Sequence, residues 1–121
     1  MYALDTNILI YYAAGDPDIL AFLRANENAV FYLPSIVIAE FLSYPLMTPA
    51  AAEKFHDFVR QTIVINLDYS IAVRAAAIRR EVKLPLADAL IAASSIAAHA
   101  SLITRNVRDF KKVNGLNVLS L

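Results

Sequence analysis

Short apolar runs alternate along this chain with longer segments in which apolar residues repeat at helical spacing. The runs are only three or four residues long, which is typical of short buried strands. The predicted strands cover residues 2–4, 30–33, 63–65, 101–104 and, more weakly, 118–119. The predicted helices cover about residues 6–13, 18–26, 35–44, 49–60, 69–82, 86–99 and 106–112.

Turn-forming and capping residues mark the boundaries of these helices. Gly15, Asp16 and Pro17 predict a turn between the first two helices. Ser35 is a candidate N-cap for the third helix, because a serine hydroxyl can accept a hydrogen bond from the free backbone N–H groups of a first turn. Thr48 is a candidate N-cap for the fourth helix, with a proline at the first helical position.

Strands that alternate with helices predict parallel strands joined by helical crossovers. The predicted strands are apolar on both faces, as buried parallel strands are. There are no repeats, linkers or low-complexity segments. The sequence therefore predicts a single domain over residues 1–121, an α/β fold built as a three-layer α/β/α sandwich around a short parallel sheet of four to five strands.

Composition narrows the class of protein further. The chain has no cysteine, no basic leader at residues 1–12 and no apolar stretch of about 20 residues, so we expect no disulfides, no signal peptide and no membrane span, and a cytoplasmic location. Hydrophobic residues make up 59% of the chain, above the typical ~45–50%. This excess predicts a homodimer or obligate complex, although alanine-rich helices would account for it equally well.

Net charge is zero, so no overall charge attracts nucleic acid. The distribution is less even, because residues 68–121 hold most of the basic side chains. Four of them, Arg105, Arg108, Lys111 and Lys112, surround Asp109. A basic cluster beside an acid suits the binding of a phosphodiester, but such a run is also typical of a solvated helix face.

The predicted topology places four acidic residues at one edge of the sheet: Asp5, Glu40, Asp88 and Asp109. Ligands of open parallel sheets bind beyond the carboxyl ends of the strands. Asp5 directly follows the first strand, Glu40 lies in the helix after the second, and Asp109 follows the fourth. The helix that starts near Asp88 runs antiparallel to the fourth strand, so its first turn lies at the same edge.

Three of these acids stand in apolar surroundings. Asp5 lies in LDTN, Glu40 in SIVIAEFL and Asp88 in LPLADALIAA. Acids in such settings are rarely buried unless they are paired or bind metal, and carboxylates that share a site repel one another unless a cation neutralises them. Oxygen ligands without His or Cys favour Mg²⁺, Mn²⁺ or Ca²⁺ over Zn²⁺. Mg²⁺ is usually completed by waters and substrate phosphate, which indicates phosphodiester hydrolysis by metal-activated water, with Mg²⁺ or Mn²⁺ as the expected cofactor.

Each acid also has a purely structural interpretation. Asp5 could serve only as a helix N-cap, and Asp88 only as a favourable charge in a first helical turn. Asp109 could be paired with its basic neighbours. Glu40 has no evident capping or pairing role, so it is the most specific signal of the four.

The same residues carry a family resemblance over the whole chain. LDTNILIYY at 4–12 resembles the opening motif of the PIN-domain family, and LPSIVIAEFLSYP at 33–45 resembles its second motif. LPLADALIAASSIAAHASLITRNVRDFKKVNGLNVL at 84–119 resembles the third motif and the closing segment. The chain resembles most the VapC-type toxin branch of bacterial and archaeal toxin–antitoxin pairs.

The resemblance implies a metal-dependent endoribonuclease with Asp5, Glu40 and Asp88 as metal ligands. It also implies an RNA substrate, a homodimer and an antitoxin protein that holds the enzyme inactive by covering its substrate groove. Many relatives place an acid two residues after the threonine of the closing segment, where this chain has Asn106; the nearest carboxylate is that of Asp109. On this basis Asp109 is assigned provisionally to the catalytic set.

Further residues are expected to position the substrate. The hydroxyls of Thr6 and Thr104 would hold water or phosphate, as would Asn106, and the basic side chains of Arg105 and Arg108 would hold RNA. The alternative from another class is a non-catalytic PIN-like module that binds RNA or protein, against which the intact acid set argues.

Other enzyme classes fit the sequence poorly. A haloacid-type phosphatase needs a second acid two residues after the first, where this chain has Asn7. A receiver domain needs an acidic pair before its phospho-acceptor, and none is present. His56 and His99 lie on predicted helices without a serine elbow, which disfavours a nucleophilic triad.

Overall fold

A computed structural model describes residues 1–121, and its strands form one five-stranded parallel sheet. The strands are β1 (Tyr2–Leu4), β2 (Phe31–Pro34), β3 (Ile63–Ile65), β4 (Ser101–Thr104) and β5 (Val118–Ser120). The helices are α1 (Thr6–Ala13), α2 (Pro17–Ala25), α3 (Ser35–Leu42), α4 (Pro49–Val59), α5 (Tyr69–Val82), α6 (Leu86–Ala97) and α7 (Val107–Phe110). The predicted alternation of strands and helices is confirmed.

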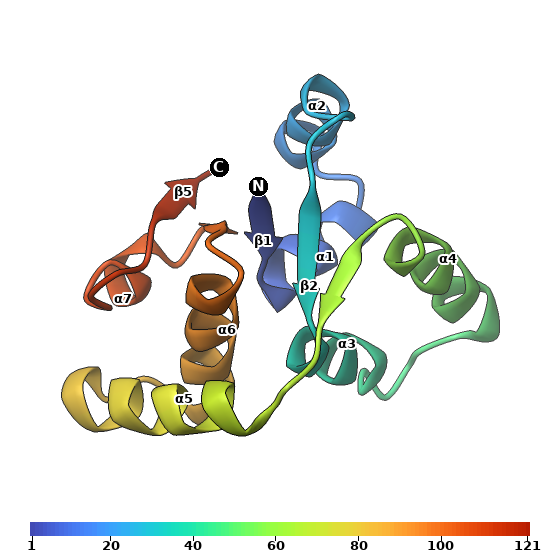
Figure 1. Ribbon diagram of the computed structural model, residues 1–121. Coiled ribbons are helices and arrows are strands. Elements are labelled where there is room, and N and C mark those ends of the chain that lie inside the picture. The colour runs from blue at the N-terminus through green and yellow to red at the C-terminus, as the bar shows by residue number, and fades with distance from the viewer.

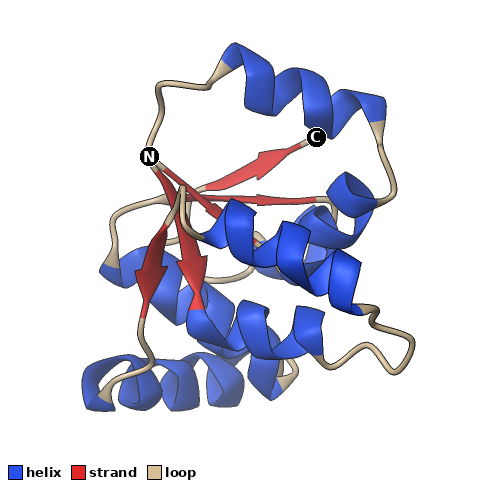
Figure 2. Ribbon diagram, turned by 90° about the vertical axis from the view of Figure 1, so that its right-hand side faces the viewer, coloured by secondary structure: helices blue, strands red, loops and turns tan.

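The strands lie in the order β3-β2-β1-β4-β5, and all neighbours are parallel. The chain moves from β1 to β2 and β3 in one direction through α1–α4. It then crosses to the other side of β1 through α5 and α6 and continues through α7 to β5. Helices consequently cover both faces of the sheet, as the three-layer prediction requires (Figures 1 and 2). None of these helices is long and apolar enough to cross a membrane.

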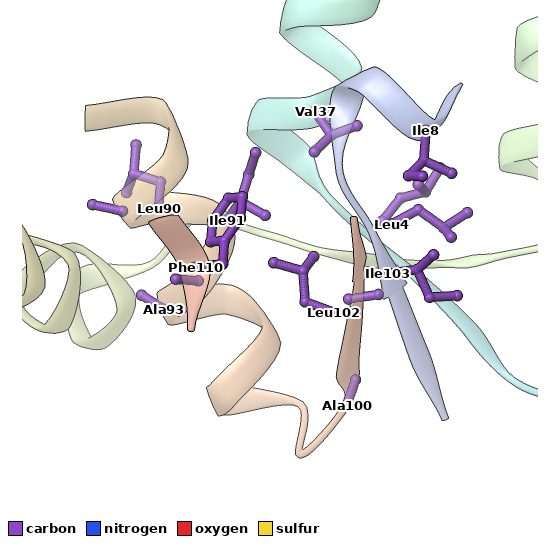
Figure 3. Close-up of a cluster of buried hydrophobic side chains, with 14 of the residues drawn as sticks. Leu4, Ile8, Val37, Leu90, Ile91, Ala93, Ala100, Leu102, Ile103 and Phe110 are labelled. Atoms are coloured by element: carbon purple, nitrogen blue, oxygen red, sulfur yellow. The ribbon is translucent and has the colours of Figure 1, made fainter. Parts of the chain in front are cut away.

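The core lies where α6 packs on the centre of the sheet. Every residue from Ala89 to Ser95 is buried, and Ala89 to Ala93 belong to one core cluster with buried residues of β1, β2 and β4. Figure 3 shows Leu90, Ile91 and Ala93 in this cluster. Five of the seven are Ala or Ser, so the helix axis can approach the strands closely. The hydroxyls of Ser94 and Ser95 donate to the carbonyls of Leu90 and Ile91 at 2.7 and 2.8 Å, so no buried hydroxyl is left without a partner.

The prediction that the strands are buried on both faces fails at the edges of the sheet. β3 has only β2 as a neighbour, and Ile63 keeps 52% of its surface exposed. β5 likewise lies beside β4 alone and contains no fully buried residue. Apolar content predicts a strand but does not tell its position in the sheet, because that depends on the order of the crossovers.

The prediction that Ser35 caps α3 is wrong. Ser35 is already helical, Pro34 occupies the cap position, and no side chain caps the helix. The Ser35 hydroxyl instead accepts a hydrogen bond from the backbone N–H of Leu67 at 3.2 Å, which ties the start of α3 to the segment after β3. Thr48 does cap α4, because its hydroxyl accepts from the N–H of Ala51 at 3.1 Å.

Candidate metal centre

The strand order reverses between β1 and β4, and a crevice opens at such a switch point beyond the carboxyl ends of the strands. Asp5 directly follows β1, and Thr104 is the last residue of β4. The parallel register of these strands brings the two side chains together from positions 99 residues apart. The Thr104 hydroxyl donates to Asp5 Oδ2 at 2.5 Å.

The Asp5 carboxylate is held by donors at both oxygens. Its Oδ1 accepts from the backbone N–H of Ile8 at 2.9 Å and so caps α1, while Oδ2 accepts from Thr104. The side chain is buried. Burial raises the pKa of Asp5, the hydrogen bonds from Thr104 and Ile8 partly offset that rise, and the nearby charge of Glu40 adds to it. Asp5 is therefore both a structural cap, as one interpretation held, and an acid fixed at the crevice.

Glu40 approaches from α3, which packs against α1. Its Oε1 accepts a hydrogen bond from the hydroxyl of Thr6 at 2.6 Å. Thr6 directly follows Asp5 in the chain. The start of α1 therefore carries one candidate metal ligand, Asp5, and the hydroxyl that orients a second candidate, Glu40. The Thr6 proton is thus committed to Glu40, whereas the sequence indicated a contact with water or phosphate.

Asp88 lies in the first turn of α6 and is half-buried. It has no ion-pair partner. Burial raises its pKa most, and the negative charges of Glu40, Asp5 and Asp109 raise it further. The position in a first turn is favourable for an anion, as predicted, but it does not compensate for three neighbouring acids.

Asp5, Glu40 and Asp88 share one hollow of about 270 Å³, which we call the carboxylate hollow. It is lined by Asp5, Thr6, Asn7, Ile10, Glu40, Asp88 and Ile91. No basic side chain is among them, so the repulsion between the acids is not relieved within the protein. Asn7 is not among the site residues expected from the sequence. Its position two residues after Asp5, at the start of a helix, is the signal that could have identified it.

The donor set fits a hydrated hard cation. No three His, Cys, Asp or Glu side chains are grouped closely enough to hold one ion between them. Mg²⁺ commonly binds to one or two carboxylates and keeps several waters, each of which takes about 30 Å³. The hollow has room for an ion with such a shell, and its carboxylate and amide oxygens are ligands that Mg²⁺ and Mn²⁺ prefer.

The structure places Asp109 and Asn106 outside the lining of the hollow. Asp109 is on α7 and lies 4.0 Å from the ammonium of Lys112, yet it is near enough to Asp88 for its charge to raise the pKa of that acid. The backbone N–H of Asn106 donates to the Thr104 hydroxyl at 2.9 Å. Neither residue lines the hollow.

Of the two basic residues expected to hold RNA, only Arg108 is free and exposed. Arg105 is partly buried and forms an ion pair with Asp16, with its Nη1 atom 2.8 Å from Oδ2. Its guanidinium faces the region between α1 and α2 rather than solvent.

A second and larger cavity lies between α1, α2, β2 and α4, and we call it the apolar groove. Its volume is about 990 Å³, and its walls include Leu9, Tyr12, Phe31, Phe55 and Phe58. Its charged residues are balanced in sign: Arg24, Glu27, Lys54 and Asp57. Nothing in it resembles a set of metal ligands.

Comparison with known proteins adds a family to this geometry. The model of the PIN domain matches residues 2–116. Ribonuclease VapC2 of Rickettsia felis is 30% identical over 128 residues, which cover 96% of this chain and 94% of that protein.

Solved structures agree with the sequence match. VapBC2 from Rickettsia felis, bound to a DNA fragment from its promoter, has a TM-score of 0.86 at 25% identity, over 99% of this chain and 98% of that one. A toxin-antitoxin complex from Klebsiella pneumoniae has a TM-score of 0.81 at 29% identity, over 98% and 96%. A match over almost the whole chain, with the carboxylate hollow at the switch point of the sheet, shows that this chain belongs to the PIN-domain family.

Proposed function

We propose that this chain is a Mg²⁺- or Mn²⁺-dependent endoribonuclease and the toxin component of a toxin–antitoxin pair. The observation that carries the proposal is the carboxylate hollow, in which three acids meet at the carboxyl edge of a parallel sheet without a basic partner. The relative named Ribonuclease VapC2 supports the choice of RNA, and the toxin–antitoxin complexes among the solved structures support the biological role.

Asp5, Glu40 and Asp88 would hold the metal, partly through water. When bound, the ion would supply a Lewis acid for the phosphate and lower the pKa of an attacking water. Hydroxyl donors fix the orientation of Asp5 and Glu40, whereas Asp88 has no ion-pair partner and is free to adjust. Asn7 lines the same hollow and offers an uncharged amide to a phosphate oxygen.

The direct test is cleavage of a structured RNA with Mg²⁺, with Mn²⁺ and with EDTA. We expect cleavage with either ion and none with EDTA. Asp5→Asn should lower the rate by orders of magnitude while α1 keeps its cap, because Asn and Asp cap helices about equally well.

Asp57→Asn is the matched control for that variant, because Asp57 is an exposed acid paired with Arg60 outside the carboxylate hollow. It should leave cleavage unchanged. Intact RNA at high concentrations of the unaltered chain would instead favour the non-catalytic binding module. Undiminished cleavage by Asp5→Asn would refute the metal assignment.

An antitoxin partner would cover the apolar groove. The groove is lined mostly by hydrophobic side chains, which could receive apolar side chains of a partner, and the solved relative from Klebsiella pneumoniae is a toxin-antitoxin complex. Ala51→Glu, on the α4 wall, adds a charge to the groove without removing any packing. Co-expressed with the product of an adjacent small gene, this variant should lose co-purification, while Ala21→Glu, exposed on α2 outside the groove, should retain it.

A homodimer would form through the start of α5. Tyr69 is 86% exposed and Val73 is 53% exposed, and they lie one turn apart on the same face. A symmetric pair needs the same apolar patch on both copies, and a net charge of zero does not oppose association. Val73→Asp should shift the mass measured by light scattering towards the monomer, whereas Leu46→Asp, in an exposed loop, should not.

A further inference from the structure

Arg105 is the first residue after β4 and contacts three other parts of the fold. Its Nη1 atom lies 2.8 Å from Asp16 Oδ2, and its Nε donates to the carbonyl of Leu121 at 3.0 Å. Its guanidinium stacks over the Tyr11 ring, 4.5 Å from the centroid. One side chain therefore joins the end of β4 to α1, to the start of α2 and to the residue after β5.

Asp16 is itself fixed in place. Its Oδ1 accepts from the backbone N–H groups of Asp18 and Ile19 at 3.0 and 3.3 Å and so caps α2, which leaves Oδ2 for Arg105. The ion pair holds the pKa of Asp16 below its usual range. The guanidinium thus meets an oriented partner, and its planar fork suits simultaneous contacts that a lysine ammonium could not reproduce.

The contacts of Arg105 connect the two segments that the hydrogen bond from Thr104 to Asp5 also joins, the end of β4 and helix α1. Thr104 is the residue before Arg105, and Asp5 caps the helix that contains Tyr11. The Thr104 hydroxyl also accepts from the backbone N–H of Asn106, the residue after Arg105. Displacing Arg105 would therefore change the separation between α1 and the end of β4, which sets that hydrogen bond.

We propose that Arg105 is a positioning residue that clamps the end of β4 against α1 and α2 and thereby holds the Thr104 hydroxyl on Asp5. The inference rests on the proposed function, because it concerns the same site. It replaces the expectation that Arg105 holds RNA. A residue that contacts phosphate needs a free cationic group, whereas the polar contacts of this guanidinium are directed at Asp16 and Leu121.

Asp16→Asn tests the clamp without altering a basic residue. The asparagine keeps the cap of α2 but loses the ion pair. We expect single-turnover RNA cleavage to fall about 10- to 100-fold with little change in RNA affinity, as is typical when a partner of a metal ligand is removed. Arg105→Gln should lose at least as much, because it also removes the stacking on Tyr11 and the hydrogen bond to Leu121. Adding Asp16→Asn to Arg105→Gln should cost no more, because the ion pair is already absent.

Arg105→Lys and Arg108→Gln separate the clamp from an RNA contact. Lysine keeps a positive charge for phosphate but cannot stack and bridge as arginine does, so a clamp predicts lost cleavage and an RNA contact predicts retained cleavage. Arg108→Gln removes an exposed charge three residues away and should lower RNA affinity without changing the site. Full activity in both Asp16→Asn and Arg105→Lys would overturn the proposal.

Amide hydrogen exchange provides a readout that does not depend on cleavage. The Asn106 N–H, bonded to Thr104, should exchange faster in Asp16→Asn and Arg105→Gln, together with weaker Mn²⁺ binding. The Leu102 N–H, bonded to the Asn117 carbonyl at 2.8 Å, is the internal reference and should be unaffected. Equal acceleration at both amides, or at neither, would overturn the clamp. These measurements decide the question even if the unaltered chain cleaves no RNA, so the two proposals can fail separately.

Discussion

The carboxylate hollow and the apolar groove differ in almost every property that is used to find an active site. The groove has a volume of about 990 Å³ and is lined by aromatic and aliphatic side chains with charges balanced in sign. The hollow has only about 270 Å³, and it concentrates three acids without a basic partner. Size favours the groove, whereas uncompensated charge favours the hollow as the place for chemistry.

The difference follows from how each cavity is built. The groove opens between helices α2 and α4, and apolar side chains of both helices and of β2 line it without a cluster of like charges. The hollow forms at the carboxyl ends of β1 and β4, where the strand order reverses, and hydroxyl donors hold two of its acids in position. A cavity whose charged side chains are individually oriented indicates a ligand, whereas a large apolar one indicates a partner surface.

The largest expected effect is that of removing one charge from the hollow. Asp88→Asn should lower RNA cleavage about 1,000-fold or more, because several kcal/mol of charge stabilisation by the ion are lost and each 1.36 kcal/mol corresponds to a factor of ten. Circular dichroism should show an unchanged fold. Asp109→Asn, outside the lining, is the comparison, and a loss as large as that of Asp88→Asn would place the fourth acid inside the site.

A change in the groove should affect stability instead of chemistry. Phe55 is buried beneath the groove and stacks on Phe41, with 4.2 Å between the ring centroids. Phe55→Ala should lower the free energy of unfolding in urea by about 3 kcal/mol, and the folded fraction should still cleave RNA. His56→Ala, an exposed neighbour, should stay within about 0.5 kcal/mol of the parent. Loss of cleavage in fully folded Phe55→Ala would show that the two cavities are coupled.

Metal binding should stabilise the fold through the hollow alone. At a Mn²⁺ concentration about 100 times the dissociation constant, the gain should be about 2.7 kcal/mol, measured as a rise in Tm. Ala51→Glu, in the groove, should show the same rise, and Asp88→Asn should show little or none. An equal response in Asp88→Asn would mean that the ion binds elsewhere.

The smallest effect concerns pH in the presence of EDTA. The pKa values of Asp5 and Asp88 are raised in the folded state, so the native chain binds protons more tightly than the unfolded one, and stability should increase as pH falls from 7 towards their ordinary value of 3.8. Asp16, whose pKa is lowered, acts in the opposite direction only below that value.

Urea unfolding at a series of pH values between 7 and 4 would measure this gain as a rise in the free energy of unfolding. Asp88→Asn should reduce it, since the variant has one fewer acid to protonate. The same gain in both chains would contradict the assignment of the repulsion to the hollow.

Much of the site could be predicted from the sequence because its main determinants are local. Asp5 follows a strand, Asp88 opens a helix, and Glu40 is the one charge in an apolar helix, so each could be placed at the carboxyl edge of a parallel sheet. The fold class followed from the same alternation of strands and helices. These inferences need only the position of each acid relative to the start or end of its own strand or helix.

The partners of these acids could not be predicted in the same way. Thr6 and Glu40 are 34 residues apart, and Thr104 and Asp5 are 99 apart, and each bond depends on how elements pack and on the rotamers they allow. Ser35 shows that a correct residue type can also lead to a wrong prediction. Its hydroxyl could cap a helix, but it accepts a hydrogen bond from the distant backbone N–H of Leu67 instead. Sequence spacing identifies which groups are available, while tertiary packing decides which of them meet.

The seven buried residues of α6 also fix the direction in which the Asp88 side chain points around the helix axis. Because a helix turns once every 3.6 residues, one residue inserted after Asp88 within the buried part of α6 would rotate the carboxylate by about 100° around the helix axis. It would then point away from the hollow, although no acid had been lost. The number of residues from Ala89 to Ser95 is therefore as much a part of the site as its acids, and a segment without a single titratable side chain is intolerant of any change in length.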